Sequence, residues 1–282
     1  MTISTTRFCY MRQFFVCIVL SILAAPVMAE DLAIRLYKES GMQSQLKSMS
    51  GAFDQGFNRV APEMPKETLN DLIQMGKDSF NEPTMAKIIV AHLNDKMTDD
   101  EMQKVLDWQS SKTAKKITRL ENEAATPDGQ QKLMAYAQQL ATKQPSKSYI
   151  AQIQQLAVAS KSVDLAVEIA SNMQYSMGAG MAMANADGKP VDLDALAAQI
   201  NKAKPQLQQQ IAQYIMVSML YTYQDLSEQE LKDYIAFVSS PVGNSFYAAM
   251  FGGIDKAFVK VGQHYGKALG EYFDQQARQS KS

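Results

Sequence analysis

Residues 97–114, MTDDEMQKVLDWQSSKTA, align without gaps on residues 226–243, LSEQELKDYIAFVSSPVG, at an offset of 129 residues (226 minus 97). In both stretches the apolar residues recur at helical spacing: Met102, Val105 and Leu106 in the first, and Leu231, Tyr234, Ile235 and Val238 in the second. An aromatic residue stands at the same position of each, Trp108 or Phe237. This pattern predicts the same amphipathic helix twice.

Both stretches open with the signature of a capping box, Ser/Thr-x-x-Glu. The hydroxyl of Thr98 or Ser227 is expected to accept a hydrogen bond from the amide of the third helical residue. The carboxylate of that residue, Glu101 or Glu230, then accepts one from the amide of the capping residue. Both helices are therefore predicted to begin at equivalent positions.

The ends of the two helices differ in sequence. Each is predicted to end at a Ser-Ser pair, and in the second stretch Pro241 follows, a residue that the first position of a helix tolerates. A new helix is expected from there. In the first stretch Lys112 replaces the proline and Ala114 the following glycine, so the first helix is free to continue past the pair.

The rest of the chain fits an all-α protein made of two tandem helical repeats. Helical periodicity extends almost throughout, and no convincing alternating strand is found. Residues 36–57 correspond loosely to residues 156–177 at an offset near 120, so the second copy carries about nine extra residues, placed in a loop around residues 186–190. The predicted repeats cover residues 30–145 and 146–282. They are expected to pack as a bundle or short helical array, with one shared core or two.

The first 29 residues have the pattern of a secretory signal peptide. Arg7 and Arg12 precede a charge-free apolar run at residues 14–27, and small residues stand three and one positions before Glu30. The run has 14 residues (27 minus 14, plus one), whereas a membrane-spanning helix needs about 20. We therefore expect cleavage after Ala29, export to the periplasm or beyond, and no transmembrane segment in the mature chain.

Cysteine content and charge limit the function further. Both cysteines, Cys9 and Cys17, lie in the predicted signal peptide, so disulfides, thiol catalysis and thiolate metal sites are not expected in the mature protein. Loss of Arg7 and Arg12 changes the formal net charge from −1 to −3. A faintly acidic chain without a basic run predicts no binding to nucleic acid.

Methionine is abundant, with 18 residues, and three of them share one helical face: Met173, Met177 and Met181. Three interpretations are open. Methionine fills irregular cores and contact surfaces, it lines adaptable grooves for a protein partner, and in an oxidising compartment thioethers bind Cu(I).

The last helix is predicted to be long, running from Pro241 to about Ala277. Aromatic residues recur there every seven positions: Phe251, Phe258, Tyr265 and Tyr272. Such a stripe is typical of a packing seam. Packing within one chain, self-association and a partner-binding face are the interpretations that it allows.

No motif predicts a catalytic, cofactor-binding or metal site. The two histidines, His92 and His264, lack neighbouring ligands at metal-binding spacing, and structural or surface positions are expected for both. An enzyme that uses dispersed carboxylates stays open as an alternative. A pair of buried acids in a concave pocket would favour it, whereas an apolar groove without such a pair would favour binding.

Residues 226–243 resemble a family of bacterial exported proteins known only as a domain of unknown function. The shared signature is Ser/Thr-x-x-Glu-Leu, then an aromatic residue before Ser-Pro-x-Gly, and the stretch at 97–114 departs from it at Lys112 and Ala114. The resemblance implies a helical protein of the cell envelope and supplies no activity. Together with the missing catalytic motifs, it leads to the hypothesis of a non-catalytic interaction or chaperone-like factor.

Overall fold

The computed structural model describes residues 28–48, 64–184 and 191–279, and within these ranges the chain is helical and has no strand. The all-α fold class is confirmed. Most of the predicted signal peptide, residues 1–27, and most of the predicted loop, residues 186–190, lie outside the described residues.

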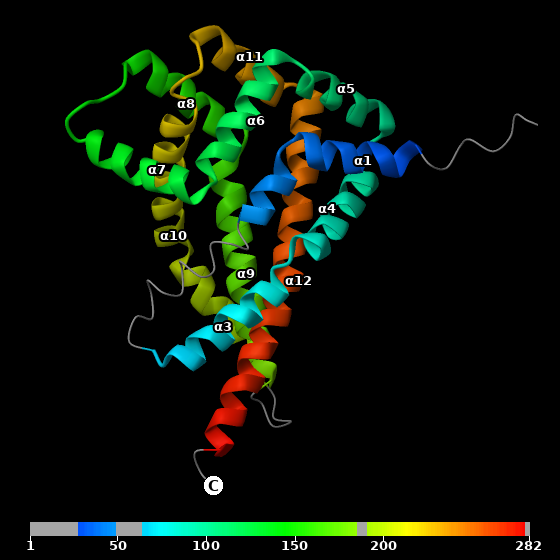
Figure 1. Cartoon of the computed structure of the whole chain (residues 1–282), viewed down its shortest axis with the longest axis vertical. Coiled ribbons are helices and arrows are strands. Elements are labelled where there is room, and N and C mark those ends of the chain that lie inside the picture. Colours follow the sequence, from blue (N-terminus) through cyan, green and yellow to red (C-terminus); the bar gives the residue numbers. More distant parts are fainter. Residues whose placement is uncertain (1–27, 49–63, 185–190, 280–282) are drawn as a thin grey trace, which may run out of the picture.

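The helices, labelled as in Figure 1, are α1 (Met28–Glu39), α3 (Lys66–Ser79), α4 (Glu82–Lys96), α5 (Asp99–Gln109), α6 (Lys112–Ala124), α7 (Pro127–Gln139), α8 (Lys147–Ala159), α9 (Ser162–Ala184), α10 (Leu193–Thr222), α11 (Glu228–Ser239) and α12 (Pro241–Gln279). Residues 42–48 are helical as well. The predicted long C-terminal helix is confirmed: α12 has 39 residues and runs along much of the long axis of the molecule (Figure 1).

Both predicted capping boxes are confirmed, at the starts of α5 and α11. The amide of Thr98 donates to Glu101 Oε2 at 2.9 Å, and the amide of Glu101 donates to Thr98 Oγ1 at 3.3 Å. The amide of Ser227 donates to Glu230 Oε2 at 2.7 Å, and the amide of Glu230 donates to Ser227 Oγ at 3.2 Å. Each box satisfies amides that a helix start leaves without intrahelical partners.

The Ser-Pro-x-Gly motif at residues 240–243 makes a sharp corner between α11 and α12. The amide of Gly243 donates to Ser240 Oγ at 3.0 Å, and a Cβ at Gly243 would overlap the carbonyl oxygen of Phe237. Thr-Pro-Asp-Gly at residues 126–129 repeats the arrangement between α6 and α7. Glycine stands at these positions because no side chain fits against the preceding helix.

The expectation that the first matched helix is free to continue past its Ser-Ser pair is wrong. Helix α5 ends at Gln109, and α6 begins at Lys112. Ser111 is the N-cap of α6, and its hydroxyl accepts from the amide of Ala114 at 3.1 Å. A capping hydroxyl is thus enough to start a new helix here without proline.

Two clusters of buried apolar residues form the core, and each draws helices from both sides of residue 145. One joins α1, α4 and α5 to α12, and the other joins α8, α10 and α11 to α6. Helices α6 and α12, which follow the two matched helices, therefore each pack in the cluster of the other matched helix.

Polar contacts show the same exchange. Lys116 on α6 forms an ion pair with Glu230, the capping-box residue of α11, at 2.7 Å. Ser245 stands 129 residues after Lys116, and it hydrogen-bonds Glu101, the capping-box residue of α5. The two contacts hence join equivalent positions of the matched stretches in opposite directions.

Left-handed residues mark two further helix-to-helix turns. Gly41 (φ 80°) follows α1, and Lys161 (φ 51°) follows α8. They lie 120 residues apart (161 minus 41), the offset seen between residues 36–57 and 156–177. At this second offset, α1 and α8 occupy corresponding places in the two clusters.

Helices α9 and α12 lie side by side and run parallel, as Figure 1 shows. Gly262, Gly266 and Gly270 stand every four residues on α12 and face the backbone or side chains of Met173, Met177 and Met181 respectively. A Cβ at Gly266 would overlap the carbonyl oxygen of Met177. The methionine face of α9 is thus a contact surface against a glycine stripe, where the backbones approach closely.

The aromatic stripe of α12 contacts the first half of the chain. The Phe80 ring packs against Phe258 and Tyr265, with centroids 6.1 and 5.9 Å apart. The hydroxyl of Tyr265 donates to the carbonyl of Leu72 at 3.4 Å, and that of Tyr272 to Asp71 Oδ2 at 3.2 Å. Most of the stripe therefore packs within one chain.

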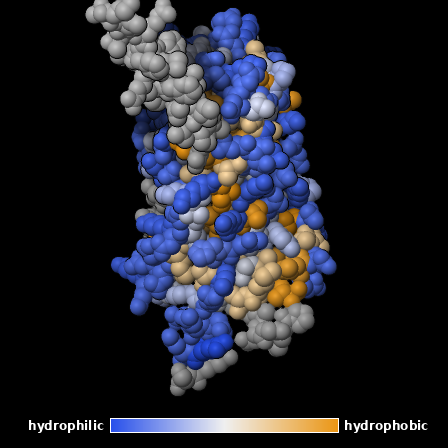
Figure 2. Space-filling view, turned by 90° about the vertical axis from the view of Figure 1, so that its right-hand side faces the viewer, coloured by the Kyte–Doolittle hydropathy of each residue, from blue (hydrophilic) through white to orange (hydrophobic). Residues whose placement is uncertain are grey.

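Of the described helices, none combines the length and the hydrophobicity that a bilayer-spanning segment needs. On the face shown in Figure 2, hydrophilic residues predominate and apolar residues form separated patches.

Candidate ligand-binding cavity

A cavity of about 790 Å³ lies where the two core clusters meet. Its walls come mainly from α6, α10, α12 and the helical residues 42–48. Apolar side chains make up much of the lining: Met42, Leu46, Trp108, Ile117, Leu156, Met219, Phe246, Met250, Phe251, Ile254 and Phe258. The volume and the apolar walls are typical of small-molecule sites.

Matched positions face this cavity from α6 and α12. Four pairs at the offset of 129 residues line it: Ile117 and Phe246, Thr118 and Tyr247, Glu121 and Met250, and Ala125 and Ile254. The cavity therefore lies between equivalent segments of the two halves.

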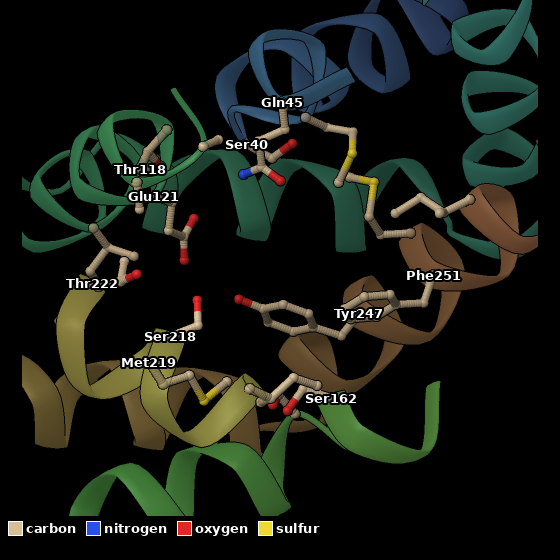
Figure 3. A pocket seen from close by; sticks show the side chains of 18 of the residues that line it. Ser40, Gln45, Thr118, Glu121, Ser162, Ser218, Met219, Thr222, Tyr247 and Phe251 are labelled. Atoms are coloured by element: carbon tan, nitrogen blue, oxygen red, sulfur yellow. The ribbon is translucent and has the colours of Figure 1, made fainter. Parts of the chain in front are cut away.

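One carboxylate, Glu121, enters the cavity from α6. Oε1 of Glu121 accepts hydrogen bonds from the hydroxyls of Tyr223 at 2.7 Å and Tyr234 at 3.2 Å. The hydroxyl of Tyr234 lies 2.8 Å from that of Tyr247, which extends the chain of hydrogen bonds along the wall. Figure 3 shows the carboxylate of Glu121 and the hydroxyl of Tyr247 pointing into the same space.

Local sequence positions each member of this cluster. Ile117 and Leu120 bury one face of α6, and Glu121 follows on the edge of that face. Tyr234 belongs to the buried face of α11 that the capping box sets in register, and Tyr223 ends α10. The positions 129 residues earlier are Val105 and Asn94, so the first half has no matching tyrosines.

Burial sets the protonation behaviour of the cluster. Desolvation raises the pKa of the Glu121 carboxyl above its ordinary value, although the hydrogen bonds from Tyr223 and Tyr234 oppose the shift. Desolvation and the nearby carboxylate together raise the pKa of the Tyr223 and Tyr234 phenols well above their ordinary value. The tyrosines therefore remain hydrogen-bond donors throughout the neutral range.

Further hydroxyls lie opposite Glu121. Ser218 and Thr222 stand one helical turn apart on α10, and Figure 3 shows both side chains directed toward the cavity. Ser40 and Gln45 close the cavity from the segment before and within residues 42–48 (Figure 3). Glu121 is the only lining residue with a full charge at neutral pH; the lining contains no Lys, Arg, His or Asp.

The residues singled out from the sequence divide between this cavity and other places. Phe251 and Phe258 line the cavity, whereas Tyr265 and Tyr272 contact α3. Met173, Met177 and Met181 are not among the lining residues and pack along α12. Sequence reasoning missed Glu121, although its place beside Ile117 and Leu120 put a carboxylate next to an apolar helical stripe.

The histidines lie apart from the cavity lining. His92 is buried with its Nδ1 3.0 Å from Lys256 Nζ, and desolvation, together with Lys256, lowers its pKa. His264 is exposed on α12. No group of three His, Cys, Asp or Glu side chains within the described ranges is arranged to hold a metal ion.

Comparison of the chain with family models, curated proteins and solved structures finds no match.

Proposed function

We propose that the protein binds a small, largely apolar molecule in the cavity between α6 and α12 and does not convert it chemically. The observation that carries the proposal is the 790 Å³ cavity with mostly apolar walls and one polar cluster at Glu121. Cavities of this kind hold a ligand by its apolar body and orient it through a few polar groups.

The inventory of acids supports binding over catalysis. Hydrolytic chemistry by carboxylates generally uses two groups, one as acid and one as base or nucleophile. The cavity has the single carboxylate Glu121, and its tyrosine neighbours stay protonated. The enzyme alternative therefore has no second group to complete it among the lining residues.

The proposed place of action is the cell envelope. It rests on the signal-peptide pattern of residues 1–29 and on the resemblance of residues 226–243 to an exported family. Intact mass and N-terminal sequencing of the protein from a periplasmic extract test this proposal. A chain that begins at Glu30 is expected, and a chain that retains Arg7 and Arg12 in the cytoplasmic fraction would contradict it.

A neutral environment-sensitive dye tests the cavity itself. Nile red is expected to bind purified protein with an increase in fluorescence, and Ser218→Phe is expected to reduce that binding because the new ring fills the cavity. Ser239→Phe places the same ring on an exposed position of α11 and serves as the matched control. Absence of dye binding, or equal binding by Ser218→Phe, would reject the cavity as the binding site.

A further inference from the structure

We propose that the cavity selects ligands that carry one protonated amine, with the ammonium group held between Glu121 and the hydroxyls of α10. This inference rests on the proposed binding function and names the chemical class of its ligand. It goes beyond shape, because an apolar cavity alone would accept neutral molecules equally well.

The charge balance of the cavity is the first argument. Glu121 brings one negative charge into a lining that contains no Lys, Arg or His. A desolvated carboxylate without a cation is costly, and a cationic ligand offsets that cost. An anionic ligand would instead meet like charge and find no cation to pair with.

The orientation of the carboxylate is the second argument. Tyr223 and Tyr234 both donate to Oε1 of Glu121. These bonds fix the side chain, and no hydrogen bond from the described residues ends at Oε2, which is left for a donor inside the cavity. Figure 3 shows the carboxylate directed into the open space and away from the wall of α6. A protonated amine is the strongest donor for such an acceptor.

Complementary acceptors lie across the cavity. An alkylammonium group has three N–H donors, of which Glu121 satisfies one. The hydroxyls of Ser218 and Thr222 point into the same space from α10 and can accept the others (Figure 3). The ring of Tyr247 borders this space as well, and aromatic faces attract cations.

The remaining walls fit an apolar body attached to the amine. Leu46 from the segment before α3, and Phe251 and Ile254 from α12, line the part contributed by the first core cluster. A ligand with one ammonium group and a hydrocarbon or aryl tail would therefore occupy both the polar and the apolar regions.

Three probes with one hydrocarbon chain and different heads test the selectivity: decylamine, decanol and decanoate, each measured by displacement of Nile red from the unaltered protein at neutral pH. Decylamine is expected to displace the dye at about one tenth of the decanol concentration or less, a tenfold affinity difference. Decanoate is expected to be the weakest. Equal displacement by decylamine and decanol, or a preference for decanoate, would overturn the inference.

Variants of α6 locate the preference. Glu121→Gln is expected to abolish the advantage of decylamine while Nile red and decanol still bind. Glu123→Gln, two residues away on the exposed face and ion-paired with Arg119, is the matched control and is expected to keep it. An amine preference that survives Glu121→Gln would assign it to another site. If Nile red itself fails to bind, the proposed function fails; if Nile red binds and no amine preference appears, only this inference fails.

Discussion

The indole of Trp108 stacks face to face on the ring of Phe237, with centroids 4.6 Å apart and planes inclined by 8°. These two residues hold the same position in the two matched stretches. A residue that contacts its own equivalent lies where the two halves meet symmetrically, and the Lys116–Glu230 and Ser245–Glu101 contacts follow the same reciprocal pattern. This is the pattern of an isologous two-fold interface, here within one chain.

The stacked pair is expected to couple the two halves energetically. Trp108→Ala and Phe237→Ala should each destabilise the protein, and the double variant should lose less than the sum of the two. The expected coupling is about 0.5–1.5 kcal/mol, the value of aromatic pairs beyond their burial. Urea unfolding of the four proteins measures it, and strictly additive losses would show that the rings do not interact in solution.

The two capping boxes are expected to contribute about equally. Thr98→Ala and Ser227→Ala should each lower the free energy of unfolding by about 1 kcal/mol, because each leaves helical amides without their side-chain acceptor. Ser239→Ala, at an exposed position of α11, should change it by less than about 0.5 kcal/mol. Thermal or urea unfolding compares the three. A cap variant as stable as the control would mean that its box contributes nothing.

The close approach of α9 and α12 depends on Gly266. Gly266→Ala should destabilise the protein strongly, since the added Cβ would overlap the backbone carbonyl of Met177 and the helices would have to separate. Gly178→Ala is the comparison: its Cβ would meet only the end of the Leu196 side chain, at 3.1 Å. There the helix propensity of alanine favours a neutral or slightly stabilising result. Denaturation midpoints measure both, and equal midpoints for the two variants would contradict the packing described.

Removal of the Glu121 charge should stabilise the empty protein at neutral pH. Because the folded-state pKa of Glu121 is raised above its ordinary value of 4.5, the stabilisation linked to its proton is complete below that value and is lost as the pH rises through the folded-state pKa. Glu121→Gln does not titrate, so its advantage in free energy of unfolding over the unaltered protein should be largest at neutral pH and shrink as the pH falls. Each unit of pKa difference corresponds to about 1.4 kcal/mol.

Unfolding free energies of both proteins at several pH values test this dependence, with Glu123→Gln as the control that should show no comparable trend. A constant difference between Glu121→Gln and the unaltered protein across the acid range would contradict the raised pKa.

The local features of the fold were readable from the sequence. Hydroxyl and carboxylate at the spacing of Thr98 and Glu101 set a helix start, because the partners lie within one turn of each other. The continuous apolar pattern after Pro241 likewise predicted α12. Where a local signal was ambiguous, as at Ser111, the sequence alone did not reveal that a capping hydroxyl suffices to end one helix and begin the next.

The binding site was not readable in this way. Glu121 lies 102 residues from Tyr223 and 113 from Tyr234, and no local pattern connects them. The exchange of α6 and α12 between the two core clusters brings these side chains to one wall. The sequence by itself thus determined which segments are helices and which faces are apolar, since these depend on neighbours three or four residues away. Only the tertiary structure decided that a cavity with a single carboxylate lies between them, since that depends on how whole helices pack.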